Sequence, residues 1–334
     1  MTYRHISRSL ACQVIFSIAI IWAGQLEAQP IPPDAVAGVD TRSLKKLNVG
    51  DAASLPDLLH YSDQPLPIVS AHRGGPMVGY PENCLATFEH TLLHTYALME
   101  VDPRLTKDGQ IVLHHDARLE RTTTGTGLVA QHTLAELQRL QLKDSAGHIT
   151  NNSIPTLDEA IQWARGKAIL VLDQKDVPIE MRVKAITERQ AERHVMVIVY
   201  SFKDAKKCYE LNNRIMMEVM VPNQEQLRLF DETGVSWKNV VAFVGHDPPT
   251  DPSLFDEIHK RGSLCMAGTS RNLDRQVLDG AVPSIEKLHD EYKQLLSVGV
   301  NLIETDIPTQ LGPLLFQQAV VVGPASRFFA TLPR

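Results

Sequence analysis

The chain has 334 residues, of which 43% are hydrophobic and 22% are charged, and its formal net charge is −6. This composition is ordinary for a globular protein, and the length suits either one large barrel or two medium domains. The negative charge argues against nucleic acid or an anionic membrane as a standing partner. We therefore expect a small-molecule partner, and the sequence does not indicate an oligomeric state.

Residues 1–28 have the pattern of a secretory signal peptide. Two arginines precede an apolar run from about Leu10 to Ala23, and small residues follow near Ala28. The apolar run is shorter than the roughly 20 residues that span a bilayer, so we expect no stable membrane insertion. We expect cleavage after Ala28 and export to the periplasm or the medium.

The cysteines do not form a disulfide framework. After such cleavage Cys84, Cys208 and Cys265 would remain, an odd and widely spaced set that allows one bridge at most. Stability must therefore come from a hydrophobic core, which a domain of this length can bury.

The rest of the chain predicts a barrel. Residues 29–64 lack periodicity and are expected to form an extended lead-in, whereas residues 65–320 alternate between apolar runs and amphipathic helical patterns. The expected strands are residues 67–71, 97–101, 168–173, 195–200, 214–219, 239–244, 263–267 and 301–305. "TLAE" (133–136) and "TLDE" (156–159) are capping boxes that open helices. Eight strand–helix alternations indicate an α/β fold, a (β/α)₈ TIM barrel.

A ninth apolar run, "IVLHHD" (111–116), predicts a small hairpin inserted after the second strand. It follows Asp108-Gly109, a pair typical of two-residue hairpin turns. With that pair as the turn, position 107 faces position 110, and Asp102 lies opposite His115. His114 then points to the other face and is expected to be structural.

Three carboxylates are expected at the barrel mouth, where active residues of such barrels lie. Glu100 and Asp102 are two apart on one strand, so both point the same way, and Asp173 ends the next parallel strand. An isolated Glu-x-Asp would more often face solvent, but neighbouring acids that converge repel one another, and a divalent cation relieves that repulsion. We expect one hard cation, Ca²⁺ or Mg²⁺, bound by these three residues.

Polar and basic residues at other strand ends complete the predicted site. His72 and His115 are candidates for proton transfer, because a histidine titrates close to neutral pH. Arg73 and Lys175 add positive charge that suits a phosphate-bearing substrate. Glu82 and Asn83 are expected to brace the site by hydrogen bonds.

Several motifs resemble those of one enzyme family. "HRG…PEN", "MEVDPRLTKDGQIVLHHDARLERTTTGTG", "PTLDEA", "LDQK", "YSF" and a late "ETDIP" occur in the order found in glycerophosphodiester phosphodiesterases. The resemblance covers about residues 67–310. It implies a (β/α)₈ barrel that hydrolyses glycerophosphodiesters to glycerol 3-phosphate and an alcohol, with the help of a divalent metal.

The same resemblance implies roles for individual residues. His72 and His115 match the family's acid/base pair, and Glu100 and Asp102 match its Glu-x-Asp metal ligands. The family's Glu-x-Lys motif is matched by "DQK", so that Asp173 stands where a glutamate is usual. The shorter side chain could move the metal or leave one coordination place to water.

The alcohol specificity and some alternatives stay open. Cys84 follows "PEN" where the family usually has threonine, and the loop "GGPMVGY" also differs. A related phospholipase D-like phosphodiesterase acting on lysophospholipids or sphingomyelin would keep the same barrel. A secreted barrel that only binds would lack the intact histidines and acids, and a metal-dependent amidohydrolase would need His-x-His where this chain has His-Arg-Gly.

Overall fold

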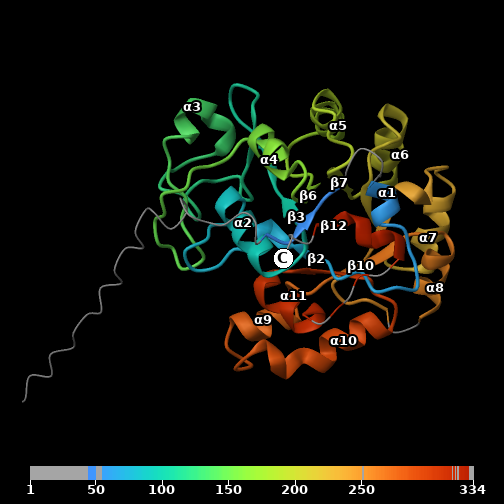
Figure 1. Ribbon diagram of the computed structural model, residues 1–334. Helices are drawn as coiled ribbons and strands as arrows, with labels where there is room; N and C mark the ends of the chain where they lie inside the picture. The colour runs from blue at the N-terminus through green and yellow to red at the C-terminus, as the bar shows by residue number, and fades with distance from the viewer. Residues whose placement is uncertain are drawn as a thin grey trace, which may run out of the picture.

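The computed structural model describes residues 44–49, 55–249, 252–317, 319, 321 and 323–330. The expected signal peptide lies outside these residues. Within them the chain folds as a closed barrel of eight parallel strands surrounded by helices (Figure 1). The predicted (β/α)₈ TIM barrel is therefore confirmed.

All eight predicted strands are present and differ from the expected ranges by a few residues at most. They are β2 (Val69–Ala71), β3 (Ala97–Val101), β6 (Ile169–Leu172), β7 (Val195–Val199), β8 (Met217–Met220), β9 (Val240–Gly245), β10 (Leu264–Gly268) and β11 (Leu302–Thr305). Their order around the barrel is β10-β11-β2-β3-β6-β7-β8-β9. Parallel strands are covered on both faces, which explains why they read as nearly continuous apolar runs.

Helices follow the strands and form the outer ring (Figure 1). They are α2 (Leu85–His94), α4 (Leu157–Ala164), α5 (Ile179–Glu188), α6 (Phe202–Leu211), α7 (Gln224–Asp231), α8 (Ser253–Lys260), α9 (Leu273–Leu278), α10 (His289–Ser297) and α11 (Pro308–Phe316). Both predicted capping boxes are confirmed: Thr133 opens the short helix α3 (Leu134–Leu137) and Thr156 opens α4. Each threonine accepts from the backbone N–H three residues on, which satisfies a donor that the first turn leaves free.

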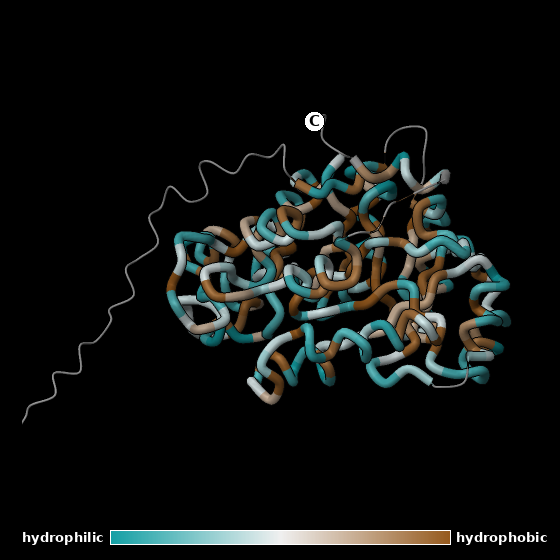
Figure 2. Tube along the Cα trace, turned by 60° about the horizontal axis from the view of Figure 1, so that its bottom comes forward, coloured by the Kyte–Doolittle hydropathy of each residue, from teal (hydrophilic) through white to brown (hydrophobic). Residues whose placement is uncertain are grey.

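The core has two shells because strand residues alternate in direction. Residues that point outward, such as Met99 and Leu170, pack with the helices in one large apolar cluster. Residues that point inward, such as Leu98, Ile169 and Met196, fill the barrel itself. Figure 2 shows the result, with apolar segments concentrated in the interior and polar segments at the periphery.

Residues of the lead-in close the N-terminal end of the barrel. Strand β1 (Lys46–Leu47) pairs with β12 (Phe329–Ala330), and helix α1 (Leu55–Leu58) follows. Leu47, Leu55 and Phe328 are buried against the inward-pointing barrel residues. The described part of the lead-in is therefore packed under the barrel, and the mouth at the opposite end stays open.

The hairpin after β3 is present, but its predicted register is wrong by one residue. Strands β4 (Pro103–Leu105) and β5 (Ile111–Leu113) pair Pro103 with Leu113. The loop has three residues and ends at Gly109, which has φ 74°, instead of the two-residue turn expected from Asp108-Gly109. This is the loop type in which a turn is followed by a left-handed residue. Asp102 consequently faces His114, whose N–H donates to the Asp102 carbonyl at 2.8 Å.

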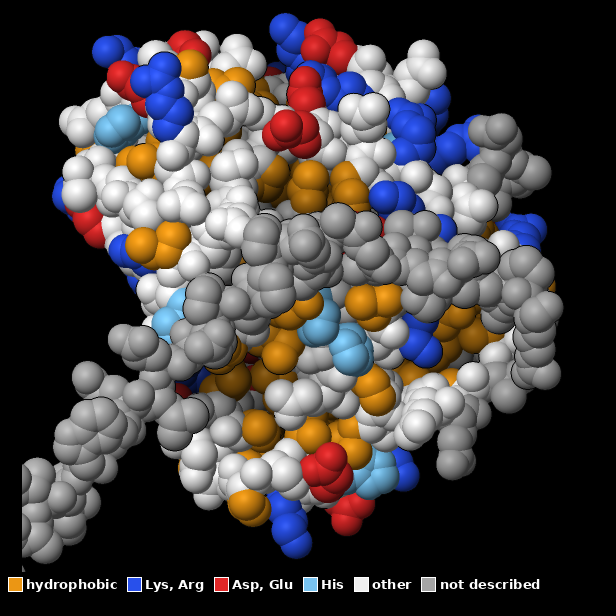
Figure 3. Space-filling view, turned by 60° about the vertical axis from the view of Figure 1, so that its left-hand side comes forward, with side chains coloured by type: hydrophobic (Ala, Val, Ile, Leu, Met, Phe, Trp, Pro, Cys, Tyr) orange, Lys and Arg blue, Asp and Glu red, His pale blue; other side chains and the backbone are white. Residues whose placement is uncertain are grey.

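The described surface carries charges of both signs. Figure 3 shows one face, on which acidic and basic side chains are interspersed along the upper edge and apolar side chains are visible across the middle. In the part of the chain that the structure covers, no helix is both long and apolar enough to span a membrane. Cys84, Cys208 and Cys265 are buried free thiols.

Candidate active site

A polar cavity of about 690 Å³ opens at the C-terminal ends of the barrel strands. Six of the predicted site residues line it: His72, Arg73, Glu100, His115, Asp173 and Lys175. The other three, Glu82, Asn83 and Asp102, are buried, and each contacts a residue of this set directly: Glu82 and Asn83 contact Arg73, and Asp102 contacts Lys175. The structure therefore brings all nine predicted residues into one site.

The three predicted metal ligands converge as the strand pattern requires. Carboxylate oxygens of Glu100, Asp102 and Asp173 all lie within 4.8 Å of one another, and all three residues are buried. Burial, followed by the charge of Asp102, raises the pKa of Glu100 well above its usual value. The three acids thus form a site of concentrated negative potential, made of the hard oxygen ligands that Ca²⁺ and Mg²⁺ prefer.

Lys175 and Asn83 hold two of these acids. The Lys175 ammonium lies 2.6 Å from Asp173 Oδ2 and 3.0 Å from Asp102 Oδ1. Asn83 Nδ2 donates to Asp102 Oδ2 at 2.6 Å, and Asn83 Oδ1 accepts from the Asp102 N–H at 2.9 Å. Asp102 Oδ1 receives no hydrogen bond of regular geometry, and the Lys175 ammonium is its ion-pair partner.

His72 is held by the Asp306 carboxylate, and Asp306 is held in turn by Asp274. Its Nδ1 lies 2.6 Å from Asp306 Oδ1, and the Asp306 N–H donates to Asp274 Oδ2 at 2.7 Å. Burial lowers the pKa of His72, but the hydrogen bond to Asp306 and the charges of Glu100 and Glu304 outweigh burial and raise this pKa to about 10. His72 is therefore an imidazolium at neutral pH.

His115 is held in a similar way but titrates differently. Its Nδ1 lies 2.7 Å from Asp116 Oδ1, and Arg121 binds both oxygens of Asp116 at 2.6 and 2.9 Å. Burial lowers the pKa of His115, and the charges of Arg73 and Lys175 act in the same direction. The imidazole of His115 is therefore neutral at physiological pH.

The neighbouring His114 does not reach the cavity. Its side chain is buried, its Nδ1 lies 2.8 Å from the Asp116 carbonyl oxygen, and its Nε2 lies 2.9 Å from Thr122 Oγ1. The hairpin register differs from the predicted one, yet the expected division between His114 and His115 holds in the geometry. The pairing of β4 with β5 ends at Leu113, before the two histidines. The directions of their side chains are therefore set by the backbone that follows the hairpin and not by the strand register.

Glu82 braces the rim through two arginines. It accepts from Arg73 Nη1 at 3.1 Å and from Arg121 Nη1 and Nη2 at 2.9 and 2.8 Å. Burial opposes ionisation of Glu82, but the hydrogen bonds from Arg121 and the charge of Arg73 outweigh it and lower the pKa. The Glu82 carboxylate therefore links the loop after β2 to the loop that holds His115.

The backbone is strained at three of these positions. Arg73, Asn83 and Lys175 have φ values of 53°, 55° and 34°, a region that residues with side chains rarely adopt. Such strain concentrates at functional sites, where the surrounding contacts stabilise it. At Arg73 it directs the N–H to Glu100 Oε2, at 2.7 Å.

Sequence reasoning assigned no role to four further acids or hydroxyls of the cavity. Tyr200, Glu218, Glu304 and Asp306 line it, and the Tyr200 hydroxyl donates to Asp173 Oδ1 at 2.7 Å. Burial raises the pKa of both Glu218 and Glu304. The signal that could have found the three acids is the one that identified Glu100: an acid within or directly after an apolar strand, at a position that points inward.

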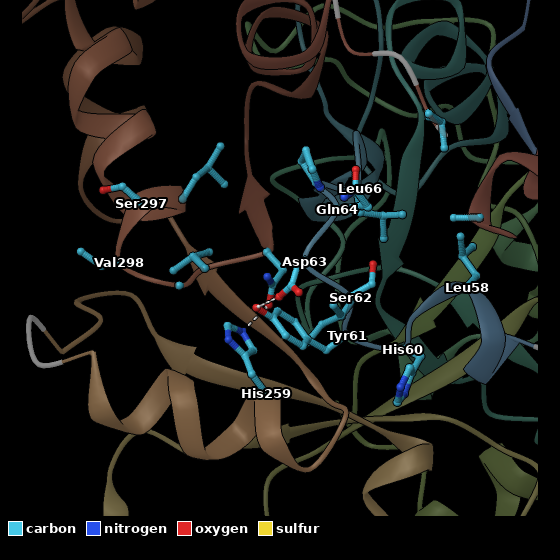
Figure 4. Close-up of a pocket in the computed structure, with 18 of the residues that line it drawn as sticks. Leu58, His60, Tyr61, Ser62, Asp63, Gln64, Leu66, His259, Ser297 and Val298 are labelled. Carbon is cyan, nitrogen blue, oxygen red and sulfur yellow. Dashed lines mark hydrogen bonds between the residues drawn. The ribbon is translucent and has the colours of Figure 1, made fainter. Parts of the chain in front are cut away.

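A second cavity, of about 890 Å³, lies at the opposite end of the barrel. Figure 4 shows side chains that line it, Tyr61 and His259 among them. Tyr61 stacks on His259 with ring centroids 3.7 Å apart, and His259 Nε2 lies 2.9 Å from Asn301 Oδ1. Among the residues that are described there, no group of three acids, cysteines or histidines converges. Although this cavity is larger, the converging carboxylates and the two histidines lie at the mouth, which is therefore the candidate active site.

Comparison with known proteins agrees with this geometry. Residues 72–310 match the model of the glycerophosphoryl diester phosphodiesterase family. A crystal structure of a glycerophosphoryl diester phosphodiesterase from Parabacteroides distasonis is 40% identical, with a TM-score of 0.81, over 86% of this chain and 100% of that one. An Oleispira antarctica phosphodiesterase, solved in complex with the product sn-glycerol-3-phosphate, shares the fold at 23% identity and a TM-score of 0.55, over 75% of this chain and 97% of that one.

Curated sequences give the same family over different lengths. A glycerophosphodiester phosphodiesterase of Bacillus altitudinis is 28% identical over 72% of this chain and 94% of its own length. A glycerophosphodiester phosphodiesterase from Caldanaerobacter subterraneus is 34% identical over 42% of this chain and 62% of its own length. The match to a Bacillus subtilis relative covers 48% of that relative's length. On the family match and the site together, the chain belongs to the glycerophosphoryl diester phosphodiesterase family of enzymes.

Proposed function

We propose that the protein hydrolyses glycerophosphodiesters to glycerol 3-phosphate and an alcohol, with a divalent cation and two histidines. The observation that carries the proposal is the pairing of a carboxylate triad with two differently protonated histidines in one cavity. Family membership supports the reaction class. The fold relative from Oleispira antarctica, which was solved with sn-glycerol-3-phosphate, supports the product.

The residues at the mouth fit a divalent cation. Glu100, Asp102 and Asp173 supply converging carboxylate oxygens, and the buried Asp102 Oδ1 lacks a hydrogen bond of regular geometry. The Lys175 ammonium, in contact with both aspartates, marks the place as one that favours positive charge. When bound, Ca²⁺ or Mg²⁺ would polarise the phosphate and offset the charge that develops on its oxygens.

The two histidines divide the proton transfers between them. Nδ1 of each ring is occupied by a carboxylate, so Nε2 of each is the nitrogen available to substrate. Neutral His115 accepts a proton from the attacking hydroxyl group as a new P–O bond forms. Protonated His72 donates a proton to the ester oxygen of the alcohol as the old P–O bond breaks.

Two attacking groups fit this arrangement. One is water, and the other is the 2-hydroxyl of the substrate's glycerol, which would give a cyclic phosphate that water then opens. Arg73 and Lys175 line the same cavity and can bind the phosphate oxygens. A neighbouring hydroxyl is already positioned for attack, which favours the second route for substrates that contain glycerol.

The first prediction concerns the two histidines. His72→Ala and His115→Ala should each lower kcat by at least ~10²-fold, the lower range for loss of a general acid or base. His114→Ala is the matched control and should lower kcat far less, because its ring faces Thr122 and not the cavity. Release of glycerol 3-phosphate from a glycerophosphodiester measures all three. Near-normal rates for both cavity variants would contradict the mechanism.

The second prediction concerns protonation. Asp306→Asn removes a charge and weakens the hydrogen bond that raises the pKa of His72, so this pKa should fall from about 10 toward its usual 6.5. The alkaline limb of the pH–kcat/KM profile should move to lower pH with it, since activity requires protonated His72. NMR titration of the imidazole measures the pKa directly, with Asp158→Asn, in an exposed pair on α4, as control. An unchanged His72 pKa would refute the assignment.

The third prediction concerns the cation. Exhaustive chelation should abolish activity, and Ca²⁺ or Mg²⁺ should restore it. Glu100→Gln and Asp102→Asn should weaken the binding of the cation, measured by calorimetry, whereas His115→Ala should leave it in place. Full activity of metal-free protein would overturn this part of the proposal.

We also propose that the protein is exported, on the basis of its charged start, apolar run and Ala28. The mass of intact protein recovered from the periplasm or medium should correspond to loss of about the first 28 residues. Recovery of the whole, uncleaved chain from the cytosol would show that the N-terminal pattern is not a signal peptide.

A further inference from the structure

The wall of the cavity that faces the carboxylate triad is basic. In a ring of eight strands the fourth neighbour stands opposite, so β9 and β10 face β3 and β6, which carry the triad. The chain leaves β9 at His246 and leaves β10 toward Ser270, Arg271 and Arg275. All four residues line the same cavity as the proposed catalytic groups.

Arg271 is available to bind an anion. It is exposed, and within the described part of the chain its guanidinium makes no hydrogen bond or ion pair. Arg275 lies one helical turn further along and has Asp279 as its partner, at 3.4 Å, with more than half of each side chain exposed. An exposed pair of this kind is weak, so a ligand anion can compete for Arg275 as well.

The backbone that carries Arg271 is fixed. Asn272 Nδ2, directly after it, donates to the His246 carbonyl oxygen at 2.5 Å, which joins the loops after β9 and β10. Thr269 and Tyr292 donate to the buried Asp274 carboxylate, both at 2.7 Å, and anchor the start of α9. Because the backbone is already fixed, binding of an anion has to order the Arg271 side chain but not the loop that carries it.

The acids that line the cavity next to this wall do not pair with its arginines. Asp306 is paired with His72 at 2.6 Å, and Glu218 and Glu304 lie at the floor, where burial raises their pKa. The wall also offers little to a quaternary ammonium, which proteins bind on open aromatic faces. Phe243 is only 7% exposed and has the His246 ring against it, at 5.5 Å between centroids.

We propose that Arg271 determines specificity for glycerophosphodiesters whose alcohol arm carries an anionic oxygen group. The inference rests on the proposed function: with the phosphate held by the triad side, the alcohol arm crosses the cavity and ends at this wall. The carboxylate or second phosphate of such an arm binds the Arg271 guanidinium, for which bidentate recognition of planar or tetrahedral oxyanions is favourable. Arms that end in an ammonium group are disfavoured by the same charge.

A matched pair of substrates tests this proposal. Glycerophosphoserine and glycerophosphoethanolamine differ by one carboxylate on the alcohol arm, so the ratio of their kcat/KM values isolates its contribution. The protein should prefer glycerophosphoserine by about tenfold, the lower range for a hydrogen bond between charged groups. Arg271→Gln should bring the ratio near one, Arg271→Glu should reverse it, and Arg271→Lys should retain part of it.

The control is Arg228→Gln, since Arg228 lies on α7 and pairs with Glu232 away from the cavity. This variant should keep the parental ratio. If the parent protein hydrolyses neither substrate, the proposed function itself is wrong. If it hydrolyses both and Arg271→Gln leaves their ratio unchanged, the function stands and the assignment of Arg271 is wrong.

Discussion

The repulsion among buried acids at the barrel mouth is the interaction to which the rest of the site responds. Glu100, Asp102, Asp173, Glu218 and Glu304 are each less than a tenth exposed, and ionised carboxylates so placed are costly unless they are paired. Burial raises the pKa of three of them, so that part of the charge is removed by protonation. The remaining charge is met by cations, the Lys175 ammonium and the His72 imidazolium, and by the amide of the strained Asn83. A divalent cation would satisfy the same demand more completely, because one ion can contact several carboxylates.

The barrel accounts for where these acids lie. Inward positions two residues apart form successive layers, and on β3 they run from Leu98 through Glu100 to Asp102. The lower layer is closed by Leu47 and Phe328, and apolar side chains predominate there. The upper layers meet the open cavity, where water and counter-charges are available to polar groups. The change from apolar to acidic along a strand therefore follows the change from closed end to open mouth.

The sequence was sufficient wherever local pattern and this alternation decide the structure. The eight strands, the capping boxes at Thr133 and Thr156 and the convergence of the triad all follow from residue spacing, and the structure contains them. The hairpin register could not be predicted, because Asp108-Gly109 fits a three-residue loop as well as a two-residue one. Tertiary contacts, which the local sequence does not encode, decide between the two loops. Asp306 was missed for another reason: its importance lies in a contact with His72, which is 234 positions away in the chain.

The two histidines show how second neighbours set a protonation state. Each ring has its Nδ1 on a carboxylate at nearly the same distance, 2.6 Å for His72 and 2.7 Å for His115. Arg121 holds the Asp116 carboxylate in place. Burial, together with the charges of Arg73 and Lys175, lowers the pKa of His115 although Asp116 and Asp102 act to raise it. The Asp306 backbone N–H donates to the buried Asp274 carboxylate, and the charges of Glu100 and Glu304 add to the effect of Asp306 on the pKa of His72. Similar contacts at Nδ1 thus give an acid on one side of the cavity and a base on the other, because Glu100 and Glu304 raise the pKa of His72, whereas burial and the charges of Arg73 and Lys175 lower that of His115.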